Sequence, residues 1–141
     1  MTADRRLYRL VQLNAGVLLL ALPTALLPFA WMDAVHREFL GLGPLSDVPL
    51  TAYMARSLSL VYAMHGVVVL GVTLNWERYR SAVPLLAKLH VAFGLAMLAN
   101  DLAAGLPWWW VAAEGPGVIA YALVVLAAAR RAEREREEPT S

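Results

Sequence analysis

Ionisable side chains interrupt the long apolar stretches of this sequence at few positions. The candidates for chemistry are Arg56, His65, His90, Asp101 and Glu114. Placing an Arg or Asp side chain at the centre of a membrane helix costs about 2.5–3.5 kcal/mol, so such groups should face other helices and have partners. Two kinds of chemistry are open to them: a polar pocket built from the arginine and the two carboxylates, or a site built from two histidines.

Arg56, Asp101 and Glu114 fall near the same end of the apolar segments that contain them. They are therefore predicted to share one level, towards the outer face of a membrane. One interpretation of this cluster is a small polar pocket that binds a ligand or relays protons. The other is a structural ion pair that locks neighbouring helices together.

The two histidines His65 and His90 should differ in depth by only about 5 Å, at 1.5 Å of rise per residue. Such a pair could ligate haem b or form a proton relay. Helical periodicity places Asp101 and His90 on one face, but Arg56 and His65 on opposite faces of their own helix. We therefore expect Arg56 to face Asp101. A single histidine bonded to a backbone carbonyl is the alternative to haem.

Several other classes of chemistry find no support in the sequence. There is no cysteine, which excludes disulfides, thiolate zinc sites and iron–sulfur clusters. No phosphate loop, H-E-x-x-H pattern, EF-hand or G-x-S-x-G elbow occurs. The basic residues flank apolar segments, so membrane topology explains them better than nucleic acid does. We expect no metal site, no catalytic residue and no nucleic-acid partner.

The elements that must position these side chains are membrane helices. The chain has 141 residues, of which 60% are hydrophobic and 16% charged. Its mean hydropathy is +0.55, whereas a soluble domain carries about 25% charged residues. A crossing needs about 20 apolar residues, so this length holds about four. We predict an all-α fold, an integral membrane four-helix bundle that forms one domain over residues 1–141.

The predicted spans are 10–31, 50–75, 83–104 and 112–130, with a solvated, frayed tail over 131–141. In the first span, Pro23 and Pro28 should bend the outer half. In the last, Glu114-Gly115-Pro116 resembles a helix start, yet Gly117 to Ala129 would reach only about 20 Å. Either arginines after Ala129 snorkel outward, or residues 108–113 enter the membrane.

The distribution of Lys and Arg predicts the orientation. Nine arginines flank the N-terminus, the 76–82 turn and the C-terminus, against one in the 32–50 loop and none in the 105–116 loop. Basic residues accumulate on the cytoplasmic side of bacterial membranes. We therefore expect an even number of spans, both termini in the cytoplasm, and a multi-pass protein of the bacterial inner membrane.

Three segments carry a family resemblance: residues 75–80 (NWERYR), 101–108 (DLAAGLPW) and 114–116 (EGP). With them the chain resembles small bacterial four-helix membrane proteins of the DoxX-like and BphX-like kind, over roughly its whole length. The resemblance implies a helical bundle and assigns no catalytic residue. It also implies links to quinol oxidation or thiol stress, but the absence of cysteine does not suit a thiol role.

These patterns favour a non-enzymatic accessory or small-ligand-binding module in the lipid bilayer, as a homo-oligomer or within a larger membrane complex. A small proton-coupled transporter that uses Arg56, Asp101 and Glu114 is an alternative. A redox or quinone-linked membrane protein that uses His65 and His90, with haem b or quinone as its cofactor, is another.

Overall fold

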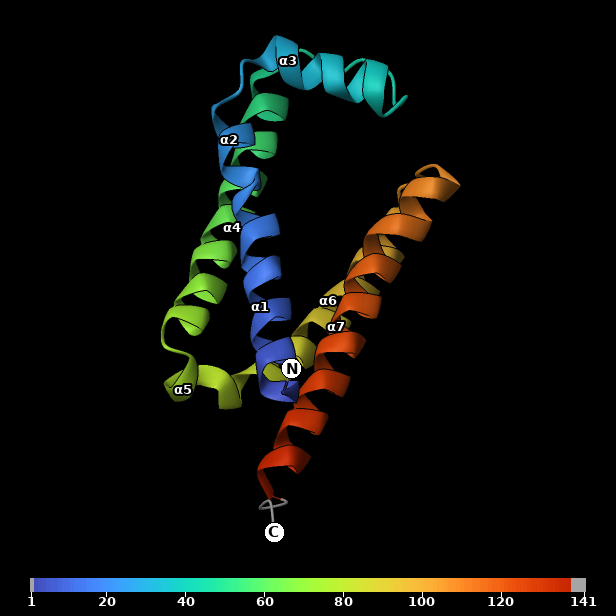
Figure 1. Cartoon of the computed structure of the whole chain (residues 1–141). Helices are drawn as coiled ribbons and strands as arrows, with labels where there is room; N and C mark the ends of the chain where they lie inside the picture. Colours follow the sequence, from blue (N-terminus) through green and yellow to red (C-terminus); the bar gives the residue numbers. More distant parts are fainter. Residues whose placement is uncertain (1, 138–141) are drawn as a thin grey trace. The chain divides into compact units, whose positions relative to one another are not determined.

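The computed structural model describes residues 2–137, and all regular secondary structure in that range is helical (Figure 1). Four helical stretches are long and apolar enough to cross a membrane, as in a multi-pass membrane protein: Ala3–Leu26, Pro49–Leu74, Trp76–Ala103 and Trp108–Glu137. The predicted all-α class with four membrane-length helices is therefore confirmed.

The chain forms two compact units. The terminal unit comprises Met1–Val11 with Val72–Ser141, and the central unit comprises Gln12–Gly71. The boundaries fall inside two helices, α1 (Ala3–Leu19) and α4 (Pro49–Leu74). A single domain over residues 1–141 stays a prediction.

In the central unit, prolines interrupt the first predicted span. The helix α1 ends at Leu19, and it is followed by α2 (Ala21–Leu26) and α3 (Phe29–Ala34). Pro23 has no N–H to donate to the carbonyl of Leu19, and the residue before Pro28 is forced towards an extended backbone. The bend expected from these two prolines therefore takes the form of breaks in the helix.

A short helical segment and a loop follow α3 in the central unit. The helix continues as η1 (Val35–Phe39), and a loop then leads to α4. Gly41 and Gly43 adopt positive φ angles of 64° and 82° there, as a break at glycine requires. The carboxylate of Asp33 accepts a hydrogen bond of 2.7 Å from the N–H of Leu45, which fixes the returning loop.

In the terminal unit, a tight turn leads into a pair of long helices. The turn contains α5 (Trp76–Tyr79) and η2 (Arg80–Ala82), and the pair consists of α6 (Val83–Ala103) and α7 (Trp108–Glu137). These two helices pack side by side in opposite directions (Figure 1). Gly105, with a φ of 67°, provides the left-handed residue in their connection.

The start of α7 corrects one prediction. The helix begins at Trp108, after Pro107 accepts the first backbone bonds from Trp110 and Val111, and it runs through Gly115-Pro116 without a break. Its 30 residues correspond to about 45 Å. The helix is therefore longer than the roughly 20 Å expected for Gly117 to Ala129, and it is long enough to cross a membrane. In lipid a continuous helix keeps backbone groups paired, and an internal proline is tolerated.

Most of the buried residues of α6 and α7 are small. The buried residues of the two helices recur at helical spacing, and they are Val83, Ala87, Gly94 and Asp101 on α6, and Gly115, Ala122, Val125, Ala129 and Ala132 on α7. Large apolar side chains point outward instead: Leu85, Leu89, Leu95, Leu102 and Leu123 are each more than half exposed.

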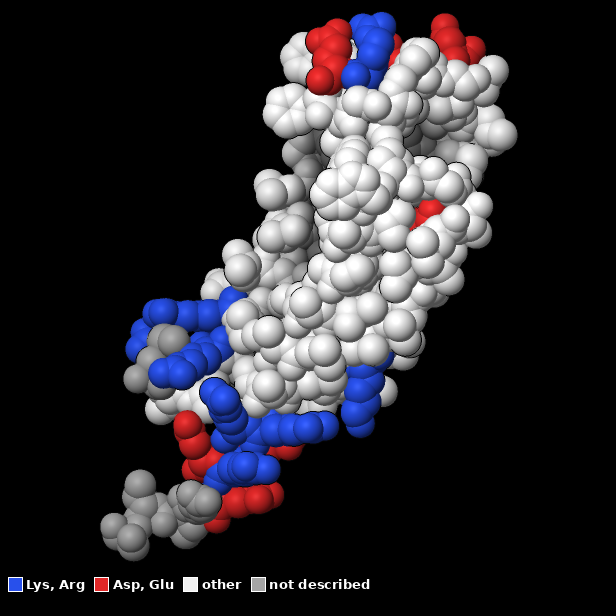
Figure 2. Space-filling view, turned by 90° about the vertical axis from the view of Figure 1, so that its right-hand side faces the viewer, with Lys and Arg blue, Asp and Glu red and all other residues white. Residues whose placement is uncertain are grey.

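This distribution is the reverse of a soluble protein's, because large apolar groups face out and small ones face in. Small residues let helices approach closely when lipid is the solvent. On the face shown in Figure 2, basic and acidic side chains gather towards the end where α7 finishes, and the surface of α6 and α7 beyond them is uncharged apart from a small acidic patch. The terminal unit therefore has the surface of a membrane-embedded helix pair.

Candidate functional site

The carboxylate of Asp101 is the most unusual polar group in the terminal unit. Asp101 is only 2% exposed, near the end of α6. Its Oδ2 is the one buried side-chain polar atom within residues 2–137 that has no hydrogen-bond partner. Burying a polar group without a hydrogen bond costs about 1–3 kcal/mol, and a charged group costs more. Such a buried acceptor marks Asp101 as a candidate site residue.

The sequence of α6 directs Asp101 towards α7. Gly94 lies seven residues earlier, which is nearly two helical turns and about 10 Å along the same face. A Cβ built on Gly94 would stand 2.9 Å from the carbonyl oxygen of Gly115, so the backbones touch at that level. Leu98, one turn further, also lies against Gly115. Asp101 follows on this face, opposite the first turns of α7.

Glu114 lies on α7 directly before Gly115 and is partly buried. The next residue, Gly115, lies against Leu98, three residues before Asp101 on α6. The indole N–H of Trp110, one turn earlier, donates to Oε2 of Glu114. The ring of Trp109 meets that of Trp110 edge to face, with centroids 5.6 Å apart. The structure thus places Asp101 and Glu114 on facing turns of α6 and α7, with a tryptophan pair beside Glu114.

Arg56, the third member of the predicted cluster, lies on α4 in the central unit. Its guanidinium donates a hydrogen bond of 3.3 Å to the carbonyl oxygen of Leu27, where the chain leaves α2. That carbonyl lies at a helix end, where backbone acceptors lack intrahelical donors. Since Asp101 belongs to the terminal unit, the predicted pairing of Arg56 with Asp101 stays a prediction.

His90 faces α7 from the same side of α6 as Asp101. Its ring meets that of Tyr121 on α7 edge to face, with centroids 6.3 Å apart. Its Nδ1 lies 2.8 Å from the carbonyl oxygen of Leu86, and a carbonyl only accepts, so this nitrogen donates. This bond stays within α6, so the alternative to haem, a histidine bonded to the backbone of a neighbouring helix, stays a prediction.

His65 belongs to the central unit, so a site shared by His65 and His90 stays a prediction, as do haem b and quinone. Across residues 2–137, the structure contains no group of three or more His, Asp or Glu side chains that could hold a metal ion. The acidic pair on α6 and α7 is therefore the candidate site with the best geometric support.

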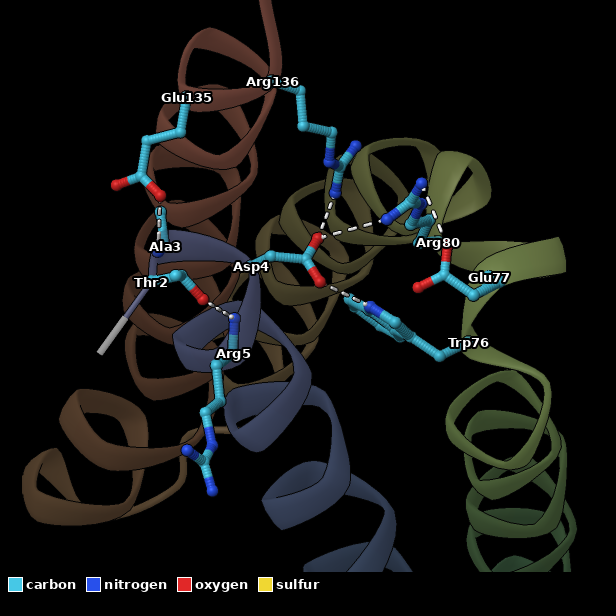
Figure 3. Close-up of polar contacts among 9 residues, drawn as sticks. All are labelled: Thr2, Ala3, Asp4, Arg5, Trp76, Glu77, Arg80, Glu135 and Arg136. Atoms are coloured by element: carbon cyan, nitrogen blue, oxygen red, sulfur yellow. Dashed lines mark hydrogen bonds and ion pairs between the residues drawn. The ribbon is translucent and has the colours of Figure 1, made fainter. Parts of the chain in front are cut away.

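A second polar cluster, which we call the Asp4 hub, joins the ends of the terminal unit (Figure 3). The indole N–H of Trp76 donates to Oδ2 of Asp4 at 2.9 Å. Arg136 also binds the Asp4 carboxylate, and a nitrogen of Arg80 lies 3.8 Å from it. Arg80 in turn pairs with Glu77 at 3.0 Å. Asp4 thus connects the start of α1, the α5–η2 turn and the end of α7.

The predicted solvated tail is helical and exposed at most positions up to Glu137, and contacts with the hub hold its end in place. α7 stays helical to Glu137, and the Oε2 of Glu135 accepts a hydrogen bond of 2.8 Å from the N–H of Ala3. The first turn of a helix has N–H groups without intrahelical acceptors, and Glu135 satisfies one of them. Residues 138–141 of the predicted tail lie outside the described range.

The electrostatics of the hub favour an ionised Asp4, which precedes the apolar run of the first span. Burial by itself raises the pKa of this carboxyl. The hydrogen bonds from Trp76 and Arg136, and the charges of Arg136 and Arg80, lower the pKa by more, so it lies below its ordinary value. The hub is a saturated structural cluster, and in this it differs from the acidic pair.

Comparison of the chain with protein-family models, with curated proteins and with solved structures gives no match.

Proposed function

We propose that this chain is a non-enzymatic, small-ligand-binding module of the bacterial inner membrane, with four spans and both termini in the cytoplasm. The ligand site is the acidic pair Asp101 and Glu114. The observation that carries the proposal is the buried Oδ2 of Asp101, which has no hydrogen-bond donor within the described residues. The module works as a homo-oligomer or within a larger complex, and a DoxX-like relationship on residues 75–80 and 101–108 is part of the proposal.

Two observations support the membrane placement. Outward-facing leucines cover the α6–α7 pair, while glycine and alanine fill its interior. The Asp4 hub also brings the N-terminal segment, the α5–η2 turn and the end of α7 to one place. These segments carry nine of the arginines, so they share one end, as the positive-inside rule requires of cytoplasmic segments.

The acidic pair is better suited to a ligand than to holding the helices together. Two carboxylates in apolar surroundings repel each other, and Oδ2 of Asp101 loses its hydrogen bonds to water on burial. Sites that bind ligands keep such unfavourable groups because the ligand supplies the missing partner. The competing explanation is a structural ion pair between Asp101 and Arg56, and it makes the opposite prediction for stability.

Thermal unfolding of the purified protein in detergent separates these explanations. For a ligand site, Asp101→Asn removes one of the two neighbouring carboxyl groups and should raise Tm by a few degrees, since about 1 kcal/mol shifts Tm by about 2–4 °C for a chain of this size. Glu133→Gln, which removes an exposed carboxylate from α7, is the matched control and should leave Tm unchanged. A lower Tm in both Asp101→Asn and Arg56→Ala, restored by combining Arg56→Asp with Asp101→Arg, would establish the ion pair instead.

A small proton-coupled transporter is the second candidate, because the interaction of Asp101 with Glu114 places two proton-binding groups on facing helices. In proteoliposomes, a pH gradient should then drive solute uptake, and Glu114→Gln should abolish it. Uptake that continues in this variant removes Glu114 from the mechanism.

A further inference from the structure

We propose that the acidic pair Asp101 and Glu114 binds a small organic cation, namely an ammonium group attached to an apolar body. The inference rests on the proposed function and names the ligand class of that site. Three properties of the α6–α7 pair support it: the local charge, the open hydrogen-bond acceptor and the neighbouring indoles.

The local charge is negative. The basic residue nearest to Asp101 along α6 is Lys88, 13 residues earlier, and the nearest to Glu114 along α7 is Arg130, 16 residues later. At 1.5 Å per residue these separations are about 20 and 24 Å. Neither cation can neutralise the pair at contact distance, so a ligand that relieves the repulsion carries positive charge.

The open acceptor is on Asp101. Trp110 already donates to Glu114, whereas Oδ2 of Asp101 receives no donor within residues 2–137. An ammonium group has three N–H donors and no acceptor, so it can supply this hydrogen bond and also face the Glu114 carboxylate. Charge-assisted bonds of this kind are the strong ones in an apolar setting. Asp101 is therefore expected to be the main anchor.

The neighbouring indoles favour an organic cation over an inorganic one. Trp110 contacts Glu114 directly, and Trp109 meets Trp110 edge to face. Indole faces attract ammonium groups through cation–π interactions and shelter apolar groups. Trp108 is 81% exposed at the start of α7, a position typical of the headgroup region, from which an amphipathic cation can enter. Ca²⁺ takes six to eight oxygen ligands, more than two carboxylates provide.

The test uses the full-length protein in nanodiscs of phosphatidylcholine and isothermal titration with phenethylammonium chloride. We expect saturable binding, one molecule per chain. Asp101→Asn should weaken it by about ten- to a hundredfold, the loss typical of a hydrogen bond to a charged group. Glu114→Gln should weaken it less, and Glu133→Gln should leave it unchanged. 2-Phenylethanol, which keeps the ring without the charge, should not bind.

A second measurement needs no variant. Dicyclohexylcarbodiimide modifies carboxyl groups in apolar surroundings, and mass spectrometry locates the product. Phenethylammonium should slow the modification of Asp101, while 2-phenylethanol should not. Protection by the cation alone supports the proposal even if Asp101→Asn fails to fold.

Three results would overturn the inference: no saturable binding to the wild-type protein, equal binding of 2-phenylethanol, or binding that appears only in Arg56→Gln. The last would mean that Arg56 fills the site. If Asp101→Asn raises Tm but phenethylammonium does not bind, only the ligand class is wrong. If Asp101→Asn and Arg56→Ala lower Tm and the charge exchange restores it, the proposed function itself fails.

Discussion

The backbone of Gly94 on α6 lies directly against the backbone of Gly115 on α7. A Cβ built on Gly94 would stand 2.7 Å from Cγ1 of Ile119 and 2.9 Å from the carbonyl oxygen of Gly115, and a Cβ on Gly115 would stand 2.8 Å from the carbonyl oxygen of Gly94. Real Cβ contacts are not this short, and two of these neighbours are backbone atoms, which cannot rotate away. The two glycines therefore set the distance between the helices that carry Asp101 and Glu114.

Alanine at either glycine should separate the helices. Gly94→Ala and Gly115→Ala should each lower the free energy of unfolding by about 1–3 kcal/mol, the usual cost of overpacking. Gly117→Ala is the matched control, because nothing lies within 4 Å of its added methyl group, and it should be neutral or stabilising by up to about 1 kcal/mol. Denaturant unfolding in mixed micelles measures all three. Equal effects at positions 115 and 117 would contradict the close contact.

The Asp4 hub predicts an acid-labile part of the stability. Because the pKa of Asp4 is lowered in the folded protein, ionised Asp4 stabilises the fold at pH values above its ordinary pKa of 3.8. This contribution should decrease as the pH falls below that value and should vanish below the lowered pKa. Tm measured between about pH 6 and pH 2.5 should thus fall more in the wild type than in Asp4→Asn.

The control for that experiment is Glu133→Gln, which removes an exposed carboxylate from the same end of α7. Its Tm should follow the wild-type pH dependence. If Asp4→Asn shows the same acid-induced fall as the wild type, Asp4 does not contribute through its charge.

The role of Trp76 in the hub can be separated into its ring and its N–H. Trp76 donates to Asp4 and also meets the ring of Tyr8 edge to face, with centroids 5.4 Å apart. Trp76→Phe keeps a ring and loses the donor, so it should cost about 1 kcal/mol, and Trp76→Ala should cost more. Trp31→Phe, at a residue 65% exposed, should have no measurable effect. Chemical denaturation in detergent is the measurement.

The proposed orientation predicts the behaviour of reporters. Alkaline phosphatase needs disulfides that do not form in the cytoplasm, so its fusion after Ser141 should be inactive, while a fluorescent protein at the same position should be bright. The reverse pattern would place the C-terminus outside the cytoplasm. The inner and outer ends predicted for the membrane spans would then have to be assigned again.

Much of the fold is predictable because the length of an apolar stretch and the position of a proline affect only the residues near them in the sequence. Pro28 correctly indicates a break. Gly115-Pro116 misleads, because this dipeptide breaks helices in water, whereas lipid favours continuing the backbone hydrogen bonds. The shared level predicted for Asp101 and Glu114 comes from counting residues along two helices, and the structure puts them on facing turns of α6 and α7.

The remaining features depend on contacts between distant parts of the chain. Trp76 and Arg136 are 72 and 132 positions from Asp4, and no local pattern connects them. The contact of Gly94 with Gly115 depends on the register of two helices, which no pattern within one helix reveals. Nothing in the residue types alone reveals that Oδ2 of Asp101 lacks a donor.

The Asp4 hub also has a consequence for biosynthesis. A ribosome makes Asp4 long before Arg136, because 132 positions separate them, so these partners can meet only after α7 has been made. The hub therefore cannot help the earlier helices to form, and it closes only after the helices between its partners exist. A chain that stops before Arg136 leaves Asp4 without this partner.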